Sequence, residues 1–395
     1  MRIGLITGEY PPDRGGVGDF TEQLGRALTD LEHEIDVITS SLQVSDLEYG
    51  TSVASKSAGL TVHRVVDNWR FGCWRGILKL CQDLELDVLN IQYQAAAYNM
   101  HPAINLLPRR KRRPPVVVTF HDLKVPYLFP KAGPLRWWVV RTLAQRADGV
   151  IVTNREDELR LSALEVRTSD LTRIPIGSNI PSDLPSGYDR GAERARWGIR
   201  PDNFLLGYFG FLNESKGAEE LIEALGLLVE QGLPAHLLKI GGRAGTSDPT
   251  NRKYADRVDR LIASLGLEER VHWTGYVHPE RISASMRATD VCVLPYRDGV
   301  SFRRGSLLAC LAHGRAIVTT RPAVALPEIQ DGETMLLVEP GSPSAVARAV
   351  RRVASDPTLQ ARLEAGAKKL ATRFEWDQIA QRSAKLFNRF ISGSQ

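Results

Sequence analysis

Cysteine is scarce in this sequence of 395 residues, which has four, and these form neither a Cys-x-x-Cys motif nor a cluster with histidine. Neither a zinc site nor a disulfide framework is indicated, and we expect a cytoplasmic protein. An uninterrupted apolar run of about 18 residues is also missing, so no transmembrane helix is expected. The opening residues MRIGLITGEYPPDRGG lack the basic flank and the apolar block of a signal peptide.

Positive charge is in small excess, with a net charge of +5. The first 180 residues contain 22 Lys and Arg against 21 Asp and Glu, so the excess is not concentrated there, and we expect no nucleic-acid partner. The dense basic block Arg109–Arg113 leads into Pro114 and Pro115. Two interpretations of this block are open, a solvated loop or a contact with anionic lipid.

Short apolar segments alternate with amphipathic segments in the first half of the chain. In Gly18–Leu31, for example, Phe20, Leu24 and Leu28 recur at helical spacing. Such alternation predicts an α/β fold, with a parallel sheet covered by helices on both faces. The strands expected in this half are Arg2–Thr7, Glu34–Ile38, Thr61–Val65, Asp87–Gln92, Val116–Phe120 and Gly149–Val152.

The second half has the same alternation without a sequence repeat, and a segment rich in Pro, Gly and Ser separates the two halves. We therefore expect a first domain at residues 1–178, a linker at 179–197, a second domain at 198–372 and a C-terminal helix at 373–395. The strands expected in the second half are Phe204–Phe209, Ala235–Ile240, Val271–Thr274, Val291–Leu294, Ala316–Thr319 and Thr334–Val338.

Loops that directly follow strands carry the candidate ligand contacts, because ligands of open parallel sheets bind at the carboxyl ends of the strands. After the first strand, Gly15 and Gly16 lead to a helix N-terminus, where backbone N–H groups favour a phosphate. A purely structural turn is the alternative. The glycine spacing does not match Gly-x-Gly-x-x-Gly, which argues against a nicotinamide-dependent dehydrogenase.

Two further side chains lie at such positions. His121 directly follows a strand, where an imidazole can bind a sugar or stabilise a developing charge, although a histidine satisfied by the backbone is the alternative. Lys216 lies near the start of a helix, where its charge and the helix dipole would together favour a diphosphate. An isolated lysine would instead be exposed and inert.

The segment after Val291–Leu294 contains a candidate anion site. Two arginines and a glycine at the start of an apolar helix form a cradle that a buried helix would hold in place. The arginines could instead pair with Asp298, and the serine that follows could cap the helix. The four residues are Arg303, Arg304, Gly305 and Ser306.

Recognisable segments occur in order along almost the whole chain: ITGEYPPDRGGVGDF, VVVTFHDL, IPIGSN, FGFLNESKGAEELIEAL, VHWTGYVHPERISASMRATDVCVLPYRDG, LAHGRAIVTT and FEWDQIA. Together they resemble a GT-B glycosyltransferase of family 4. The resemblance implies two Rossmann-like domains facing across a cleft, a nucleotide-sugar donor held mainly by the second domain, and a final helix that returns to the first. It also implies retention of anomeric configuration and no required metal or other cofactor.

The resemblance assigns roles by position. The sequence departs from the family pattern at two places. Phe211 stands in place of an arginine five residues before Lys216, and Ser301 and Ala309 replace the two glutamates of the family's E-x7-E motif. We predict that the two arginines replace the missing cation and that Ser301 binds a sugar hydroxyl. The transferred roles are Gly15 and Gly16 at the donor phosphates, His121 beside the transferred sugar, Lys216 at the diphosphate, and Gly305 and Ser306 as backbone phosphate contacts.

The function expected is transfer of a sugar from a nucleotide-sugar donor to a hydroxyl of a glycan, lipid-linked or small-molecule acceptor, in polysaccharide or glycoconjugate assembly. Such chemistry depends on stabilising the leaving diphosphate more than on a protein nucleophile. The alternative, prompted by the missing glutamates, is a catalytically weak homologue that binds nucleotide or glycan in a regulatory role.

A membrane partner is a separate expectation. The stretch Pro134–Arg146 combines Trp137 and Trp138 with three arginines. With Arg109–Arg113 it could rest on the inner face of an anionic membrane, where a lipid-linked acceptor would lie. An ordinary helix packed on its own sheet is the alternative.

Overall fold

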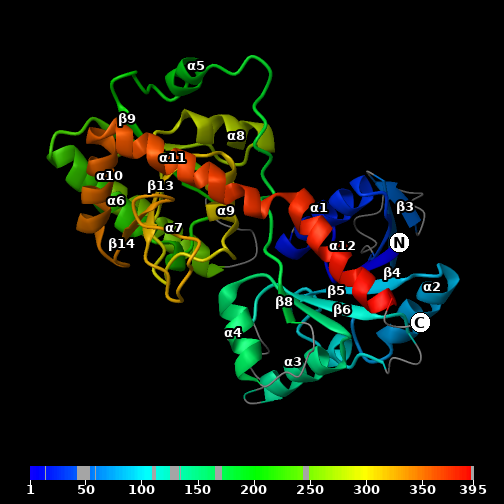
Figure 1. The fold of residues 1–395 in the computed structure, drawn as a ribbon. Coiled ribbons are helices and arrows are strands. Elements are labelled where there is room, and N and C mark those ends of the chain that lie inside the picture. The colour runs from blue at the N-terminus through cyan, green and yellow to red at the C-terminus, as the bar shows by residue number, and fades with distance from the viewer. Residues whose placement is uncertain are drawn as a thin grey trace. The chain divides into compact units, whose positions relative to one another are not determined.

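The computed structural model describes residues 1–13, 15–41, 54–57, 59–108, 113–124, 133, 135–164, 171–242 and 249–392 (Figure 1). For residues 54–57 and 249–251 the description covers the backbone alone. The chain divides into two compact units. The first unit comprises Met1–Asn179 and Phe374–Gln395, and the second unit comprises Ile180–Arg373. Each unit is an α/β sheet domain, as the alternation of strands and helices predicts.

The first unit contains a sheet of order β3-β4-β2-β1-β5-β6-β7-β8, in which only the pairing of β3 with β4 is antiparallel among the described strands. All strands predicted for this half are present. The short strands β3 and β8 lie at the two edges and were not predicted. The bounds are β1 Arg2–Ile6, β2 Glu34–Ser40, β3 Ala54–Ser57, β4 Leu60–Val66, β5 Val88–Tyr93, β6 Val116–Phe120, β7 Gly149–Val152 and β8 Leu171–Arg173.

Alternate residues of these strands point to opposite faces, and each face has its own apolar core. Ile3 and Leu5 pack in the core under α1 and α12, whereas Ile6 packs in the core under α2, α3 and α4. Helices therefore cover both faces, as predicted. The helices are α1 Gly16–Asp30, α2 Cys73–Asp83, α3 Leu135–Arg146, α4 Arg155–Ala163 and α12 Trp376–Ser392, with a 3-10 turn at Pro102–Asn105.

The last helix, α12, packs on the first unit, which confirms the predicted return (Figure 1). Ile379, Ser383 and Phe387 recur at helical spacing and are buried with the α1 core. At the start of the helix, Trp376 Nε1 donates to the carbonyl of Ser178 at 2.9 Å. A Cβ on Gly177 would lie 2.6 Å from the Trp376 ring, so the absence of a side chain there makes room for the indole.

The second unit contains a fully parallel sheet of order β11-β10-β9-β12-β13-β14. Its strands are β9 Phe204–Phe209, β10 Ala235–Ile240, β11 Val271–Trp273, β12 Val291–Leu294, β13 Ala316–Thr320 and β14 Leu336–Val338, which confirms every strand predicted for this half. Its helices are α5 Arg190–Ala195, α6 Ala218–Glu230, α7 Pro249–Ser264, α8 Pro279–Ala288, α9 Gly305–Ala312, α10 Pro343–Ser355 and α11 Pro357–Ala371, with 3-10 turns at Glu214–Lys216 and Thr372–Phe374.

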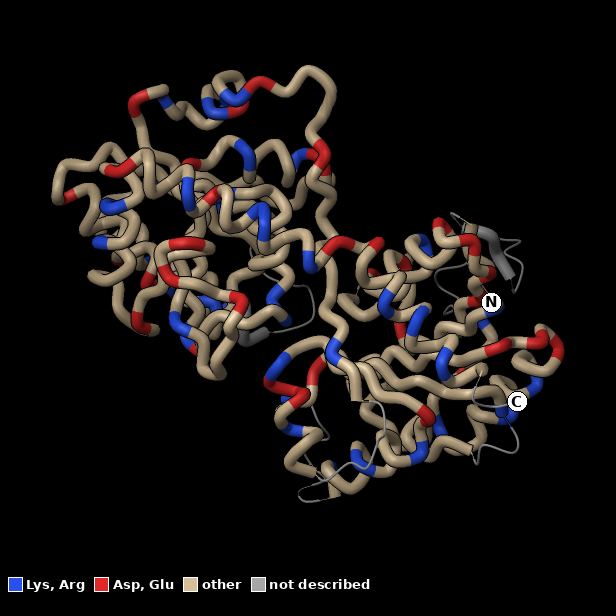
Figure 2. Tube along the Cα trace, in the orientation of Figure 1, with Lys and Arg blue, Asp and Glu red and all other residues tan. Residues whose placement is uncertain are grey.

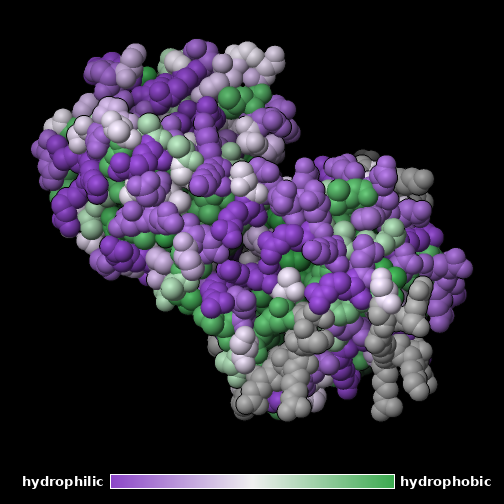
Figure 3. Space-filling view, in the orientation of Figure 1, coloured by the Kyte–Doolittle hydropathy of each residue, from purple (hydrophilic) through white to green (hydrophobic). Residues whose placement is uncertain are grey.

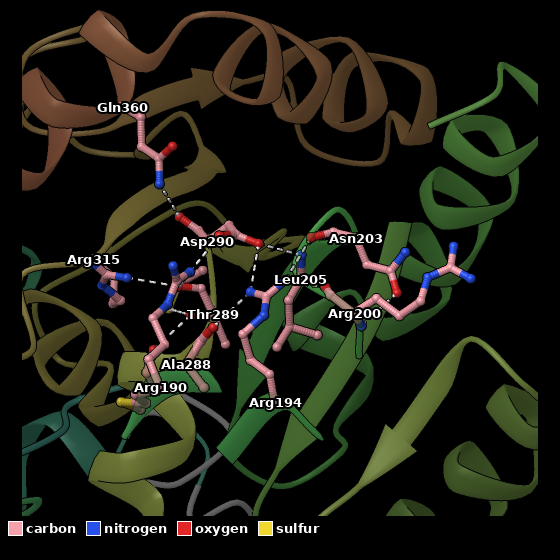
Figure 4. A network of polar contacts seen from close by, with 12 residues as sticks. Arg190, Arg194, Arg200, Asn203, Leu205, Ala288, Thr289, Asp290, Arg315 and Gln360 are labelled. Atoms are coloured by element: carbon pink, nitrogen blue, oxygen red, sulfur yellow. Dashed lines mark hydrogen bonds and ion pairs between the residues drawn. The ribbon is translucent and has the colours of Figure 1, made fainter. Parts of the chain in front are cut away.

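Residues 180–197, predicted as a linker, belong to the second unit and contain α5. Asp290, which precedes β12, anchors this helix (Figure 4). Its carboxylate accepts hydrogen bonds from Arg190 at 2.5 Å, from Arg194 at 3.0 Å and from the Leu205 amide at 2.6 Å. Pro, Gly and Ser composition indicated a linker, but the arginines of α5 tie the segment to the sheet.

Charged residues of both signs are spread over both units. Lys and Arg are interspersed with Asp and Glu along the trace in Figure 2, and Figure 3 shows mainly hydrophilic residues on the face in view. Within the described ranges, no helix is long and apolar enough to span a bilayer. Most of the predicted basic block, residues 109–112, lies outside the described residues.

Candidate functional site

The loop after β1 brings Gly15 and Gly16 to the start of α1, with Gly15 at the N-cap. Glu9 Oε1 accepts hydrogen bonds from the amides of Val17 at 3.0 Å and Gly18 at 3.4 Å. A Cβ on Gly15 would lie 2.1 Å from the Glu9 carboxyl carbon, so a side chain at this position would collide with the carboxylate. An anion of the chain itself therefore compensates the positive end of α1.

Charge near the start of α1 opposes a second anion. Burial, followed by the charges of Glu22 and Glu9, raises the pKa of Asp19 in the first turn. Gly16 has open space at its Cβ position. The contact of Gly15 and Gly16 with donor phosphates stays a prediction, and a phosphate there would meet these carboxylates.

His121 directly follows β6, and a chain of buried amides orients it. Its Nε2 donates to Gln92 Oε1 at 2.9 Å, and Gln92 donates in turn to Asn90. The Phe20 ring meets the imidazole edge-on, with ring centres 4.6 Å apart. Burial lowers the pKa of His121 to about 3, so the imidazole is neutral at pH 7. Since Gln92 Oε1 can only accept, the proton is on Nε2 and Nδ1 is left as an acceptor.

In the second unit, Lys216 lies on the 3-10 turn Glu214–Lys216 and not on α6, because Gly217 turns the chain at φ 70°. The Lys216 Nζ is 3.0 Å from the position that a Cβ of Gly210 would take. No carboxylate of the described residues pairs with this amine. Burial and the neighbouring Arg304 lower the pKa of Lys216 to about 8.

Arg303 and Arg304 both pair with Asp298, as the alternative interpretation of this segment expected. Arg303 Nη2 donates to Asp298 Oδ2 at 2.9 Å, and Arg304 Nη2 donates to Oδ1. Arg304 also donates to Ser215 Oγ at 3.3 Å, and its guanidinium lies 5.0 Å from the centre of the Tyr296 ring. Its buried Nε has no hydrogen-bond partner among the described residues. One carboxylate thus serves two guanidinium groups.

Helix α9 begins at Gly305, and its N-terminus lies beside these cations. A Cβ on Gly210 would lie 3.8 Å from Ser306 Cβ as well as 3.0 Å from Lys216 Nζ. Ser306 Oγ bonds to Tyr296 Oη at 2.7 Å and does not cap the helix. The helix is buried from Ser306 to Leu311, as its apolar sequence predicts. The buried helix holds its positive end fixed next to Lys216 and Arg304.

Ser301, predicted to bind a sugar hydroxyl, is only 2% exposed. Its hydroxyl oxygen accepts a hydrogen bond from the Arg303 amide at 3.4 Å, so it supports the loop before α9. Ala309 is fully buried within that helix. The role of Ser301 toward a sugar stays a prediction.

The second unit contains five of the predicted phosphate contacts, and we call these five residues the cationic cluster. Arg303 and Arg304 share the Asp298 carboxylate, and Lys216 has no carboxylate partner among the described residues, so the cluster has an excess of positive charge that suits a diphosphate. Over the part of the chain that is described, no group of three or more His, Cys, Asp or Glu could hold a metal ion. The cluster comprises Lys216, Arg303, Arg304, Gly305 and Ser306.

Two family models match this chain. The model for glycosyl transferases group 1 matches residues 203–356, and that for the glycosyl transferase 4-like domain matches residues 15–177. The chain belongs to the family 4-like glycosyltransferases. Its two Rossmann-like units are the two domains of the GT-B fold.

Individual relatives are distant. D-inositol 3-phosphate glycosyltransferase of Rhodococcus erythropolis is 27% identical over 236 residues, covering 58% of this chain and 51% of the relative. The chain thus matches about half the length of that relative. The enzyme of the same name from Corynebacterium efficiens is 25% identical, covering 98% of this chain and 95% of the relative. The Anabaena protein HepE, solved in complex with UDP, superposes with a TM-score of 0.75 at 20% identity, covering 98% of this chain and 100% of HepE.

Sequence reasoning missed several residues that contact the predicted site residues. Asn90 and Gln92 are polar residues at alternate positions of an otherwise apolar buried strand, a pattern that indicates a shared buried partner. Glu9 was missed because its partners, the amides of Val17 and Gly18, lie eight and nine residues further along the chain. A glutamate before a glycine-rich helix start was the available signal.

Proposed function

We propose that this glycosyltransferase moves a sugar from a nucleotide-sugar donor to an acceptor hydroxyl, with retention of anomeric configuration and without a metal. The observation that carries the proposal is the Lys216 ammonium, which has no carboxylate partner among the described residues and lies beside Arg304 and the start of α9. Two like charges brought together away from water are costly unless an anion joins them. A diphosphate has the charge and the size to do so.

The proposed chemistry follows from where charge develops. As the bond between the sugar C1 and the phosphate oxygen breaks, negative charge grows on the leaving diphosphate and an oxocarbenium-like centre forms. Lys216, Arg304 and the amides at the start of α9 are fixed donors for that charge. Attack of the acceptor hydroxyl on the same face, with its proton passing to the leaving phosphate, retains the configuration.

Relatives support the donor class. HepE has been solved with UDP and with UDP-glucose, and the curated relatives are named D-inositol 3-phosphate glycosyltransferases. We propose a nucleoside diphosphate sugar as the donor and a glycan, lipid-linked or small-molecule hydroxyl as the acceptor. The contact of neutral His121 with the transferred sugar belongs to the same proposal.

Peripheral membrane contact is a separate part of the proposal. On α3, Leu135 is 63% and Trp138 is 58% exposed, and Arg136 and Arg141 lie on the same helix. An exposed tryptophan beside arginines suits an anionic interface. Co-sedimentation with vesicles of anionic and of neutral lipid tests it, and equal binding to both would exclude an electrostatic contact with the membrane.

The experiment for the proposed function is incubation with a panel of UDP-, GDP- and ADP-sugars. We expect slow hydrolysis of one donor, with the released sugar first appearing in the anomeric configuration of the donor. Inversion would contradict the retaining mechanism. Tight donor binding without any turnover would instead identify a catalytically weak homologue. The Lys216→Ala variant, purified in the same way, is the control for hydrolysis by contaminating enzymes.

A further inference from the structure

Two polar side chains lie on one face of the central strand β5 in the first unit. Asn90 and Gln92 alternate with apolar residues along this strand, and both are 0% exposed. Strand β6 pairs with β5 in parallel, which places Asn90 opposite Val117 and Gln92 opposite Thr119, two residues before His121. Buried amides at the centre of a sheet cost stability unless they are hydrogen-bonded. We call Asn90 and Gln92 the amide row.

A backbone carbonyl fixes the direction of the hydrogen bonds in the amide row. Asn90 Nδ2 lies 3.1 Å from the carbonyl oxygen of Val117. That oxygen can only accept, so Nδ2 is the donor and the orientation of the Asn90 amide is determined. Nδ2 also donates to Thr119 Oγ1 at 2.9 Å. The Asn90 Oδ1 is therefore the atom that faces Gln92, and it faces Gln92 as an acceptor.

The same direction is passed on to His121. Asn90 Oδ1 accepts a hydrogen bond from Gln92 Nε2, which leaves Gln92 Oε1 to face His121 Nε2 at 2.9 Å. An amide oxygen cannot donate, so the ring proton lies on Nε2. The neutral imidazole has only this one ring proton, and Nδ1 is an acceptor. Among the described residues, none donates to Nδ1.

We propose that Asn90 and Gln92 are positioning residues that determine sugar specificity, because they hold His121 Nδ1 as a fixed hydrogen-bond acceptor. The inference rests on the proposed function, since it takes the transferred sugar to lie at His121. A sugar hydroxyl can donate to Nδ1, whereas a carboxylate or a deoxy position cannot. The partner of one ring nitrogen sets the role of the other, so the row selects a donor with a free hydroxyl at this place.

NMR of the ligand-free protein with isotopically labelled histidine tests the amide row, because protonated and unprotonated ring nitrogens give separate signals. A His121→Gln variant assigns the signals of this ring. In the wild type we expect a proton on Nε2 alone. Gln92→Met removes the acceptor with little change in side-chain length, and Asn90→Leu removes the group that orients Gln92. In both variants we expect a mixture of the two tautomers, although Asn90 has no hydrogen bond to His121.

Asn105→Leu is the matched control. Asn105 is also 0% exposed, and its Nδ2 donates to Tyr93 Oη at 3.0 Å. Tyr93 packs in the core on the other face of the same sheet, so this amide has no connection to the amide row. The control loses buried hydrogen bonds as Asn90→Leu does, but we expect it to keep the single tautomer of the wild type. Thermal unfolding shows that each variant is folded.

Monodeoxy analogues of UDP-glucose, or of the donor that the sugar-nucleotide panel identifies, test the role in specificity. For the analogue that lacks the hydroxyl facing Nδ1, we expect wild-type kcat/KM for hydrolysis to fall by about 3- to 10-fold, as for loss of one hydrogen bond. This difference should shrink in Gln92→Met and Asn90→Leu and persist in Asn105→Leu. Comparison between variants cancels the intrinsic reactivity of each analogue.

Two results would overturn the inference. A wild-type proton on Nδ1, or a single unchanged tautomer in both row variants, would show that the amide row does not set the proton of His121. Unchanged discrimination among the deoxy donors in both variants would show that Nδ1 binds no sugar hydroxyl, while donor hydrolysis by the wild type would leave the proposed function intact. If the wild type hydrolyses no donor, the proposed function fails and the specificity role fails with it.

Discussion

At the scale of single residues, the Lys216 ammonium is the informative group. Burial and Arg304 lower its pKa from the ordinary 10.5 to about 8, so the ligand-free protein holds a charge in an unfavourable place. A bound diphosphate would stabilise that charge and raise the pKa of Lys216 again. Proton uptake and ligand binding are therefore coupled at this side chain.

The coupling gives a pH prediction. Only the protonated amine attracts the diphosphate, so UDP affinity falls as pH rises through about 8, by about ten-fold between pH 7 and pH 9. Calorimetry at the two pH values measures the change. Lys216→Arg is the control. Because arginine stays charged over this range, we expect the variant to bind UDP with the same affinity at pH 7 and pH 9. A pH-independent wild type would contradict the role of Lys216.

Residue types and their place after strands were enough to predict Lys216, Arg303 and Arg304, because glycines and a helix start mark that loop. The pairing of Arg303 and Arg304 with Asp298 was one of two interpretations that the sequence left open. Phe211 and Tyr276, for example, lie 65 residues apart in the sequence, yet their ring centres are 5.8 Å apart because the strand order β11-β10-β9 brings their loops together. Spatial order of strands is not visible in local sequence.

At the scale of elements, composition proved a weak guide between the two units. Predicted as a linker, the segment carries α5, whose Arg190 and Arg194 meet the Asp290 carboxylate. Long-range ion pairs, not local propensity, place this helix. The edge strands β3 and β8 were missed for a similar reason, since short strands at a sheet edge depend on their neighbour and show little periodicity of their own.

Asp290→Ala tests the anchor of α5. It removes the carboxylate that pairs with Arg190 and Arg194 and accepts from the Leu205 amide, and we expect a loss of about 2–4 kcal/mol in the stability of the second unit. Urea unfolding measures it. The control is Asp202→Ala, which removes an exposed pair with Arg200 and costs less than about 0.5 kcal/mol. Equal effects of the two variants would show that Asp290 anchors nothing.

At the scale of the whole molecule, the two sheets and the returning helix were predictable, because nearly every buried strand is an apolar run and α12 has a clear apolar face. Glycines that admit a close contact could be assigned only from the structure. Gly177, for example, accommodates Trp376, which lies 199 positions further along the chain. Such contacts have no local signature.

Two partly buried histidines make stability depend on pH. Burial lowers the pKa of His121 to about 3, and burial with Arg270 lowers that of His236 to about 4, whereas both titrate near 6.5 when unfolded. The unfolded chain therefore binds more protons below pH 6.5. The contribution of these two histidines to the free energy of unfolding is fully present above that pH and decreases as pH falls toward 4. At pH 5 we expect a loss of about 2 kcal/mol, after a reduction for the solvent exposure of the two side chains.

Thermal unfolding at pH 7.5 and pH 5.0 checks this dependence. His236→Gln removes one of the titrating groups, so the difference between the two unfolding temperatures should shrink in that variant. A larger difference in the variant, or a wild type that is more stable at pH 5.0, would contradict the assignment.

The most direct test of the account is calorimetric titration of the wild type and of Arg304→Ala with UDP, GDP and ADP. The account predicts that the wild type binds at least one nucleoside diphosphate. It also predicts that loss of the Arg304 guanidinium weakens that binding by about 10- to 100-fold, as for removal of a charged hydrogen-bond donor. Unchanged affinity in Arg304→Ala would show that the diphosphate does not bind at the cationic cluster.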